Sequence, residues 1–76
     1  MQTKFKRHDR VRILIDVNPE YVEYVEDDSN KIPIVRGMEG EINIILPNGK
    51  YHVKILDKKG NIFAYAPIDE EYLELI

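Results

Sequence analysis

A chain of 76 residues, of which 43% are hydrophobic and 33% charged, has the composition of a globular protein and room for one domain. These fractions are too apolar for a disordered chain and too polar for a membrane span. The absence of cysteine excludes disulfides and thiolate metal sites. The basic first ten residues are not followed by an apolar stretch long enough for a signal peptide, so we expect a cytoplasmic protein.

The net charge of −3 conceals alternating blocks of opposite charge. Residues 1–12 and 31–60 carry an excess of bases, whereas residues 13–30 and 61–76 carry an excess of acids. Such blocks either neutralise one another in the fold or leave a dipolar surface that orients a charged partner. We expect the first eight residues to form a flexible basic arm and the rest of the chain, from 9 to 76, to form the folded domain.

The first predicted strand covers residues 10–17, where every second residue from Val11 to Ile15 is apolar. Asn18 and Pro19 end it, because proline cannot donate to a β-ladder; the same pair could open a short helical turn. The chain from there to Pro33 is expected to be a long loop.

Four further strands are predicted at residues 41–46, 50–55, 61–66 and 72–76. Gly49 and Gly60 are expected to take positive φ as the bulge residues of two tight hairpins. Residues 67–71 are predicted to form a single helical turn before the last strand. Five short strands in this order are typical of an all-β, five-stranded SH3-like barrel. The competing OB-fold usually needs a helix between strands three and four, for which this chain has no room.

Strict alternation predicts which side chains form the core: Val11, Ile13, Ile15, Ile42, Ile44, Leu46, Tyr51, Val53 and Ile55. It leaves Leu14, Ile45 and Leu56 pointing outward, together with one of the pairs Ile62/Ala64 and Phe63/Tyr65. The loop and the arm would cover these side chains, or else they form a contact patch for a partner or a second copy. We therefore expect a monomer or a weak homodimer.

The inventory of reactive side chains is thin. The only serine, Ser29, lies between Asp28 and Asn30 in the most acidic stretch, and the only threonine, Thr3, lies near the N-terminus. We expect neither hydroxyl to be activated as a nucleophile. Two histidines, His8 and the outward-facing His52, are too few for a typical zinc site. We expect no catalytic residue, no bound metal and no cofactor, and hence a protein that is not an enzyme.

Nucleic-acid binding is the alternative function, since many barrels of this size bind it. Basic residues and aromatic side chains that could stack on bases favour it: Lys4, Lys6, Arg7, Arg10, Arg12, Lys50, Lys54, Lys58 and Lys59, with Tyr51, Phe63 and Tyr65. The sequence pI of 5.3 and the two acidic blocks argue against it, because they would repel phosphate.

Recognition of a protein partner is expected on the long loop and on the outward apolar residues. The candidate partner-binding residues are Tyr21, Glu23, Tyr24, Glu26, Asp27, Asp28, Ile45 and Leu56. Tyrosines give a large contact area at low entropy cost, and the acids would attract a partner with a basic surface. In the alternative interpretation a loop tyrosine plugs the barrel mouth and the acids keep the loop soluble. No membrane partner is expected.

The phrase Gly-Met-Glu-Gly-Glu-Ile at 37–42, with Asp-Arg-Val-Arg-Ile at 9–13 and Asp-Glu-Glu-Tyr-Leu-Glu at 69–74, resembles the variable subunit of ferredoxin–thioredoxin reductase. It is similar, more loosely, to other SH3-like accessory barrels of electron transport. The resemblance implies a non-catalytic accessory barrel that packs against a partner carrying an iron–sulfur cluster or a metal. The tight hairpin at 47–49 differs from the longer connection of that subunit.

Overall fold

The computed structural model describes residues 3–25 and 32–76, which form an all-β domain with one antiparallel sheet. The six strands are β1 (Arg10–Ile13), β2 (Glu23–Tyr24), β3 (Glu39–Ile45), β4 (Lys50–Leu56), β5 (Ile62–Asp69) and β6 (Leu73–Leu75). Two single-turn 3₁₀ helices, η1 (Pro19–Tyr21) and η2 (Glu70–Tyr72), complete the elements. Across the described ranges, no helix is long and apolar enough to span a membrane.

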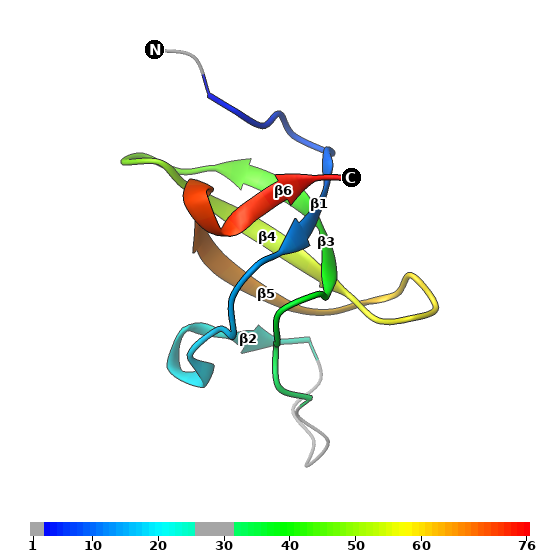
Figure 1. The fold of residues 1–76 in the computed structure, drawn as a ribbon. Helices are drawn as coiled ribbons and strands as arrows, with labels where there is room; N and C mark the ends of the chain where they lie inside the picture. The colour runs from blue at the N-terminus through cyan, green and yellow to red at the C-terminus, as the bar shows by residue number, and fades with distance from the viewer. Residues whose placement is uncertain (1–2, 26–31) are drawn as a thin grey trace.

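The sheet is strongly bent around one core. Its strand order is β2-β5-β4-β3-β1-β6, so β2 and β6 are edge strands and the sheet is not closed. Buried residues from β1, β3, β4, β5 and β6 nevertheless belong to a single hydrophobic cluster. In Figure 1, β1 and β6 pass across β4. Because one flat face could not gather all these side chains together, the bend is what creates the core.

The structure has one strand more than the sequence predicted, and it lies inside the long loop. Asn18 caps η1 by accepting a 3.0 Å hydrogen bond from the Glu20 N–H, so the alternative of a short helical turn at Asn18-Pro19 is confirmed. The chain then pairs with β5, with Glu23 opposite Tyr65. Two residues are too few to show a periodic pattern, which is why β2 was not predicted.

The core extends into the expected basic arm. Phe5 is only 1% exposed and packs edge-on against Tyr51, with ring centroids 5.3 Å apart. The Tyr51 hydroxyl accepts hydrogen bonds from the backbone N–H groups of Lys4 (3.1 Å) and Phe5 (3.3 Å). Residues 3–8 are therefore attached to the domain that was expected to begin at residue 9.

A β-bulge changes which side chains of β3 face the core. Ile42 pairs with Val53, but Ile44 pairs with His52, so the register shifts between Ile42 and Ile44. An extra residue on one strand reverses the alternation beyond it. Ile44 is therefore 48% exposed, and its predicted place in the core is wrong.

The β4–β5 hairpin forms as the sequence predicts. Gly60 has φ of 84° and its N–H donates to the Asp57 carbonyl, which closes a turn with Lys58 and Lys59 at its centre. The side chain of Asp57 accepts hydrogen bonds from the backbone of Lys59 and Asn61, each at 2.9 Å. Glycine is suited to this position because a left-handed φ strains other residues.

The β3–β4 hairpin differs in detail. Gly49 has the predicted positive φ of 74°, but Asn48 is also left-handed, with φ of 64°. The hairpin therefore has two consecutive left-handed residues, whereas only the bulge glycine was expected to take positive φ. β5 also runs further than predicted, through Pro67 to Asp69, and the helical turn follows it as η2.

Candidate functional site

The acidic part of the predicted recognition loop is only partly described. Tyr21 is 62% exposed on η1 and Glu23 is exposed on β2, as a partner-binding role requires. The remaining acids of the prediction, Glu26, Asp27 and Asp28, lie outside the described residues.

Tyr24 has a structural role. It is half-buried, its hydroxyl donates a 2.6 Å hydrogen bond to the carbonyl oxygen of Ile32, and its ring lies 6.4 Å from that of Phe63. Through Tyr24, these contacts connect Ile32 to Phe63 of β5. Tyr24 thus packs against β5, whereas the alternative interpretation placed a loop tyrosine in a barrel mouth.

Ile45 and Leu56 do not form a common patch, because they lie at opposite ends of the β3–β4–β5 meander. Ile45 pairs with Tyr51 near the first hairpin and is 38% exposed. Leu56 is only 8% exposed, yet it is not part of the core cluster that contains Ile55, because consecutive side chains of a strand point to opposite faces. Its predicted outward direction therefore stands, but the side chain is covered and not bare, which fits the alternative that other parts of the chain cover the outward residues. A register shift between Ile55 and Leu56 leaves Phe63 as an extra residue on β5.

An open groove of about 1130 Å³ lies beside Leu56. One wall is the segment from Ile32 to Glu39 that leads into β3, and the other is the β4–β5 hairpin. Its apolar lining consists of Ile32, Val35, Met38, Leu56 and Phe63. This volume is slightly larger than that of typical small-molecule pockets.

The charged residues of the groove are mostly cations. Arg10, Arg36, Lys58 and Lys59 line it, against Glu39 and Asp57. Arg10 is engaged by Glu39 at 3.7 Å. The side-chain oxygen of Asp57 accepts hydrogen bonds from the backbone N–H groups of Lys59 and Asn61.

Within the part of the chain that the structure describes, Arg36, Lys58 and Lys59 have no ion-pair partner. All three are exposed, so their charges are available at the surface. The groove is thus an apolar surface bordered by positive charge, on a chain whose net charge is negative.

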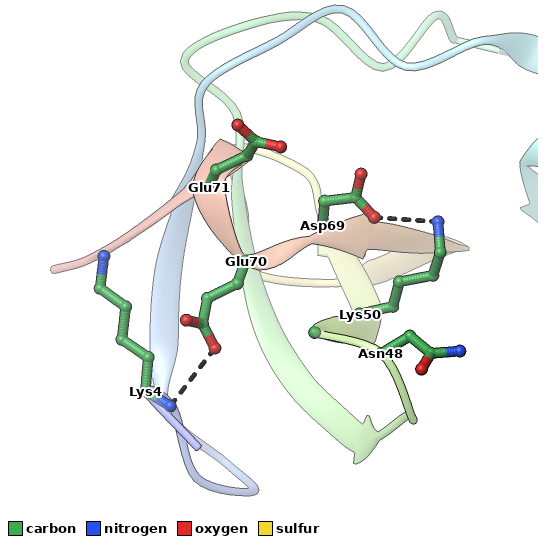
Figure 2. A pocket seen from close by; sticks show the side chains of 7 residues that line it. Lys4, Asn48, Lys50, Asp69, Glu70 and Glu71 are labelled. Atoms are coloured by element: carbon green, nitrogen blue, oxygen red, sulfur yellow. Dashed lines mark hydrogen bonds and ion pairs between the residues drawn. The ribbon is translucent and has the colours of Figure 1, made fainter. Parts of the chain in front are cut away.

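A second hollow, of about 560 Å³, lies on η2 and the β3–β4 hairpin and is lined by Lys4, Asn48, Gly49, Lys50, Asp69, Glu70 and Glu71 (Figure 2). Three of its charged side chains, those of Lys50, Asp69 and Glu70, interact within the fold. Lys50 donates a 2.9 Å hydrogen bond to Asp69, and this interaction raises the pKa of Lys50. Glu70 accepts hydrogen bonds from the Tyr51 hydroxyl and the Lys4 N–H. The hollow is therefore an attachment point of the N-terminal segment.

Both histidines contact side chains of the same domain. His52 stacks on Tyr65 with ring centroids 5.3 Å apart, and its Nδ1 lies 3.0 Å from the side-chain nitrogen of Asn43. His8 lies 3.5 Å from Glu41. Across residues 3–25 and 32–76, no group of three or more potential metal ligands comes together.

The basic residues considered for nucleic-acid binding are divided among several surfaces. Arg12, Lys50 and Lys54 each lie next to an acid, at 3.5, 2.9 and 3.6 Å from its carboxylate. Tyr51 is buried and cannot stack on a base, whereas Phe63 is half-buried beside the groove. The cations without an ion pair in the described chain lie on two separate surfaces, the groove (Arg36, Lys58 and Lys59) and the N-terminal segment (Lys4, Lys6 and Arg7), and not along one continuous stripe.

Sequence reasoning named Leu56 as a partner-binding candidate and Arg10, Lys58, Lys59 and Phe63 as candidates for nucleic-acid binding, but it did not bring them together in one groove. Phe63 was left undecided between two faces of its strand. Val35 and Met38 lie between the predicted loop, which ended at Pro33, and the strand predicted from residue 41, and no contact role was predicted for them. The apolar run Ile-Pro-Ile-Val at 32–35 was the available signal, since loops seldom carry so many apolar side chains.

Comparisons with protein-family models, with curated proteins and with solved structures gave no match to this chain.

Proposed function

We propose that this chain is a small SH3-like barrel that acts as a non-catalytic docking module for a partner protein. The strand order supports the barrel: β3, β4 and β5 form a meander, η2 follows, and β6 returns to pair with β1. A bent antiparallel sheet with a short helical turn before its last strand is the arrangement expected of this class.

The accessory role is supported by where the family-like segments lie. Residues 9–13, 37–42 and 69–74 contain β1, part of β3, and η2 with part of β6. These strands are neighbours in the order β3-β1-β6. The phrases that resemble the reductase subunit thus belong to one continuous region, which is consistent with an accessory barrel whose partner carries the redox centre.

The observation that carries the proposal is the groove between Ile32–Glu39 and the β4–β5 hairpin. Small domains seldom leave contiguous apolar surface bare unless a partner covers it. The lining combines aromatic, methionine and aliphatic side chains, which is the composition of the centre of protein interfaces. Exposed cations at the border would define the orientation of that partner.

Site-specific photo-crosslinking tests the proposal. A photoreactive amino acid replaces Val35 in the groove or, as the control, Ile44 on the far side of the β3 bulge; the two side chains are 40% and 48% exposed. We expect a defined protein adduct from position 35 only. The captured protein is then purified, and its affinity is measured for wild type, Val35→Ser and Ile44→Ser.

A purified partner that loses about tenfold in affinity for Val35→Ser, and less than about twofold for Ile44→Ser, would support groove docking. Equal losses, or no adduct at position 35, would contradict it. An adduct that nuclease removes would instead support the alternative function of nucleic-acid binding.

A further inference from the structure

The charged and apolar side chains of the groove indicate the chemistry of the partner that it binds. Its two walls both present cations: Arg36 stands on the segment before β3, and Lys58 and Lys59 stand at the tip of the β4–β5 hairpin. The apolar side chains Val35, Met38 and Phe63 lie between these elements along the lining.

The acids of the groove do not cancel these charges. Glu39 is paired with Arg10, and the Asp57 carboxylate receives two backbone N–H groups of its own turn. The charged side chains of the groove that have neither an ion pair nor a side-chain hydrogen bond in the described chain are therefore all cations, whereas the whole chain has a net charge of −3. On β4, by contrast, Lys50 and Lys54 each lie beside a carboxylate. The N-terminal segment also carries cations without an ion pair in the described chain, but the apolar lining lies only beside the cations of the groove, so the groove alone combines positive charge with these apolar side chains.

The turn also holds its lysines in place. Hydrogen bonds from Lys59 and Asn61 to the Asp57 side chain, together with the Gly60-to-Asp57 backbone bond, define the conformation of the hairpin tip. Less backbone freedom is then lost when the lysines contact a partner, so a moderate number of contacts suffices for binding.

We infer that the groove binds an acidic segment of another protein, in which at least one large apolar side chain enters the lining and flanking Asp or Glu residues face Arg36, Lys58 and Lys59. This inference rests on the proposed docking function and names its partner by chemistry. It differs from the expectation of a basic partner, which concerned the acidic loop at 18–33.

Selection from a random peptide library on immobilised full-length protein tests the inference. We expect the selected peptides to combine Asp or Glu with Leu, Phe or Trp, and to exclude clusters of Lys and Arg. A selected peptide is then labelled, and its affinity is measured by fluorescence anisotropy, beside a peptide in which the acids are replaced by Asn and Gln.

Two charge-reversal variants provide the matched comparison. Lys58→Glu/Lys59→Glu changes the groove, whereas Lys4→Glu/Lys6→Glu makes the same change in net charge at exposed lysines outside it. The groove variant should lose at least about tenfold in affinity for the acidic peptide, and the control less than about twofold. The loss should shrink at high salt, because exposed charges are screened.

Each contrary result has a distinct meaning. Peptides that lose affinity for Val35→Ser but carry no excess of acids, or that bind both charge variants equally, would overturn the inference and leave groove docking intact. Selected peptides that bind wild type and Val35→Ser equally would contradict the docking function itself. A poly(U) oligonucleotide that displaces the acidic peptide would contradict the inference in favour of nucleic acid.

One further variant tests whether acidic residues of the same chain already occupy the groove. Replacing Glu26, Asp27 and Asp28 by Gln, Asn and Asn removes the acids that precede Ile32 in the sequence. We expect the peptide affinity to change by less than about twofold. A tightening of about tenfold would mean that these acids already compete for the cations, which would overturn a foreign segment as the occupant.

Discussion

The hydroxyl group of Tyr51 donates a 2.6 Å hydrogen bond to Oε2 of Glu70 and thereby connects the centre of the sheet to η2. The same hydroxyl oxygen accepts the N–H groups of Lys4 and Phe5. One buried phenol therefore joins β4, η2 and the N-terminal segment. Burial, followed by the hydrogen bond to Glu70, raises the pKa of Tyr51.

The raised pKa makes stability depend on alkaline pH. The folded state keeps the Tyr51 proton above the ordinary pKa of 10.0, where the unfolded chain begins to lose it. The contribution is fully present below about pH 10 and is lost as the pH rises through the folded-state pKa. Tyr51→Phe lacks this titration, and it should cost about 1–3 kcal/mol at neutral pH because three hydrogen bonds disappear.

Urea unfolding at a series of pH values measures this effect. The difference in unfolding free energy between wild type and Tyr51→Phe should narrow above about pH 10. The two proteins differ only in this one hydroxyl group, so the difference between them isolates Tyr51. A difference in unfolding free energy that stays constant across the alkaline range would show that the Tyr51 hydroxyl is not buried and hydrogen-bonded in this way.

Phe5→Ala should destabilise the domain by about 3 kcal/mol, because the ring is buried in the core and its removal leaves a cavity. Lys6→Ala, at an exposed position next to it, should change the unfolding free energy by less than about 0.5 kcal/mol. Thermal melting of the two variants checks this. If both melt at the wild-type temperature, the N-terminal segment is not part of the core.

Gly40→Ala should cost about 1–3 kcal/mol through overpacking between β3 and β4. A Cβ there would lie 2.6 Å from Cγ1 of Val53 and 2.8 Å from the backbone oxygen of Lys54. Because the second contact is with backbone, adding Val53→Ala should not restore stability. Recovery in the double variant, measured by urea unfolding, would mean that only the side-chain contact matters.

The meander and its hairpins were predictable because local chemistry determines them. Alternation identified β4, and the turn residues at 57–60 determined the second hairpin together with its left-handed glycine. On β3 the alternation fails at a bulge. Ile44 follows a register shift that no alternating pattern reveals, and it lies on the side opposite to its prediction. Leu56 is covered although it lies outside the core cluster, and the segment beside it is distant in the sequence.

The groove could be predicted only in fragments. Lys58 and Lys59 were visible as turn residues and Leu56 as a partner-binding candidate. Their meeting with Val35 and Met38 depends on β3 pairing with β4, which brings the start of β3 beside the end of β4. Such long-range pairing is set by the whole sheet and has no signature in a short window of sequence.

The central claim is that this chain docks a partner through the groove beside Leu56. The most direct measurement is backbone amide chemical-shift mapping of isotope-labelled protein, titrated with the partner captured at position 35 or with the selected acidic peptide. We predict that the largest shifts fall on residues 35–38 and 56–63, on both walls of the groove. Shifts centred instead on Tyr21 and Glu23, or on the β6 edge at Leu75, would contradict the account.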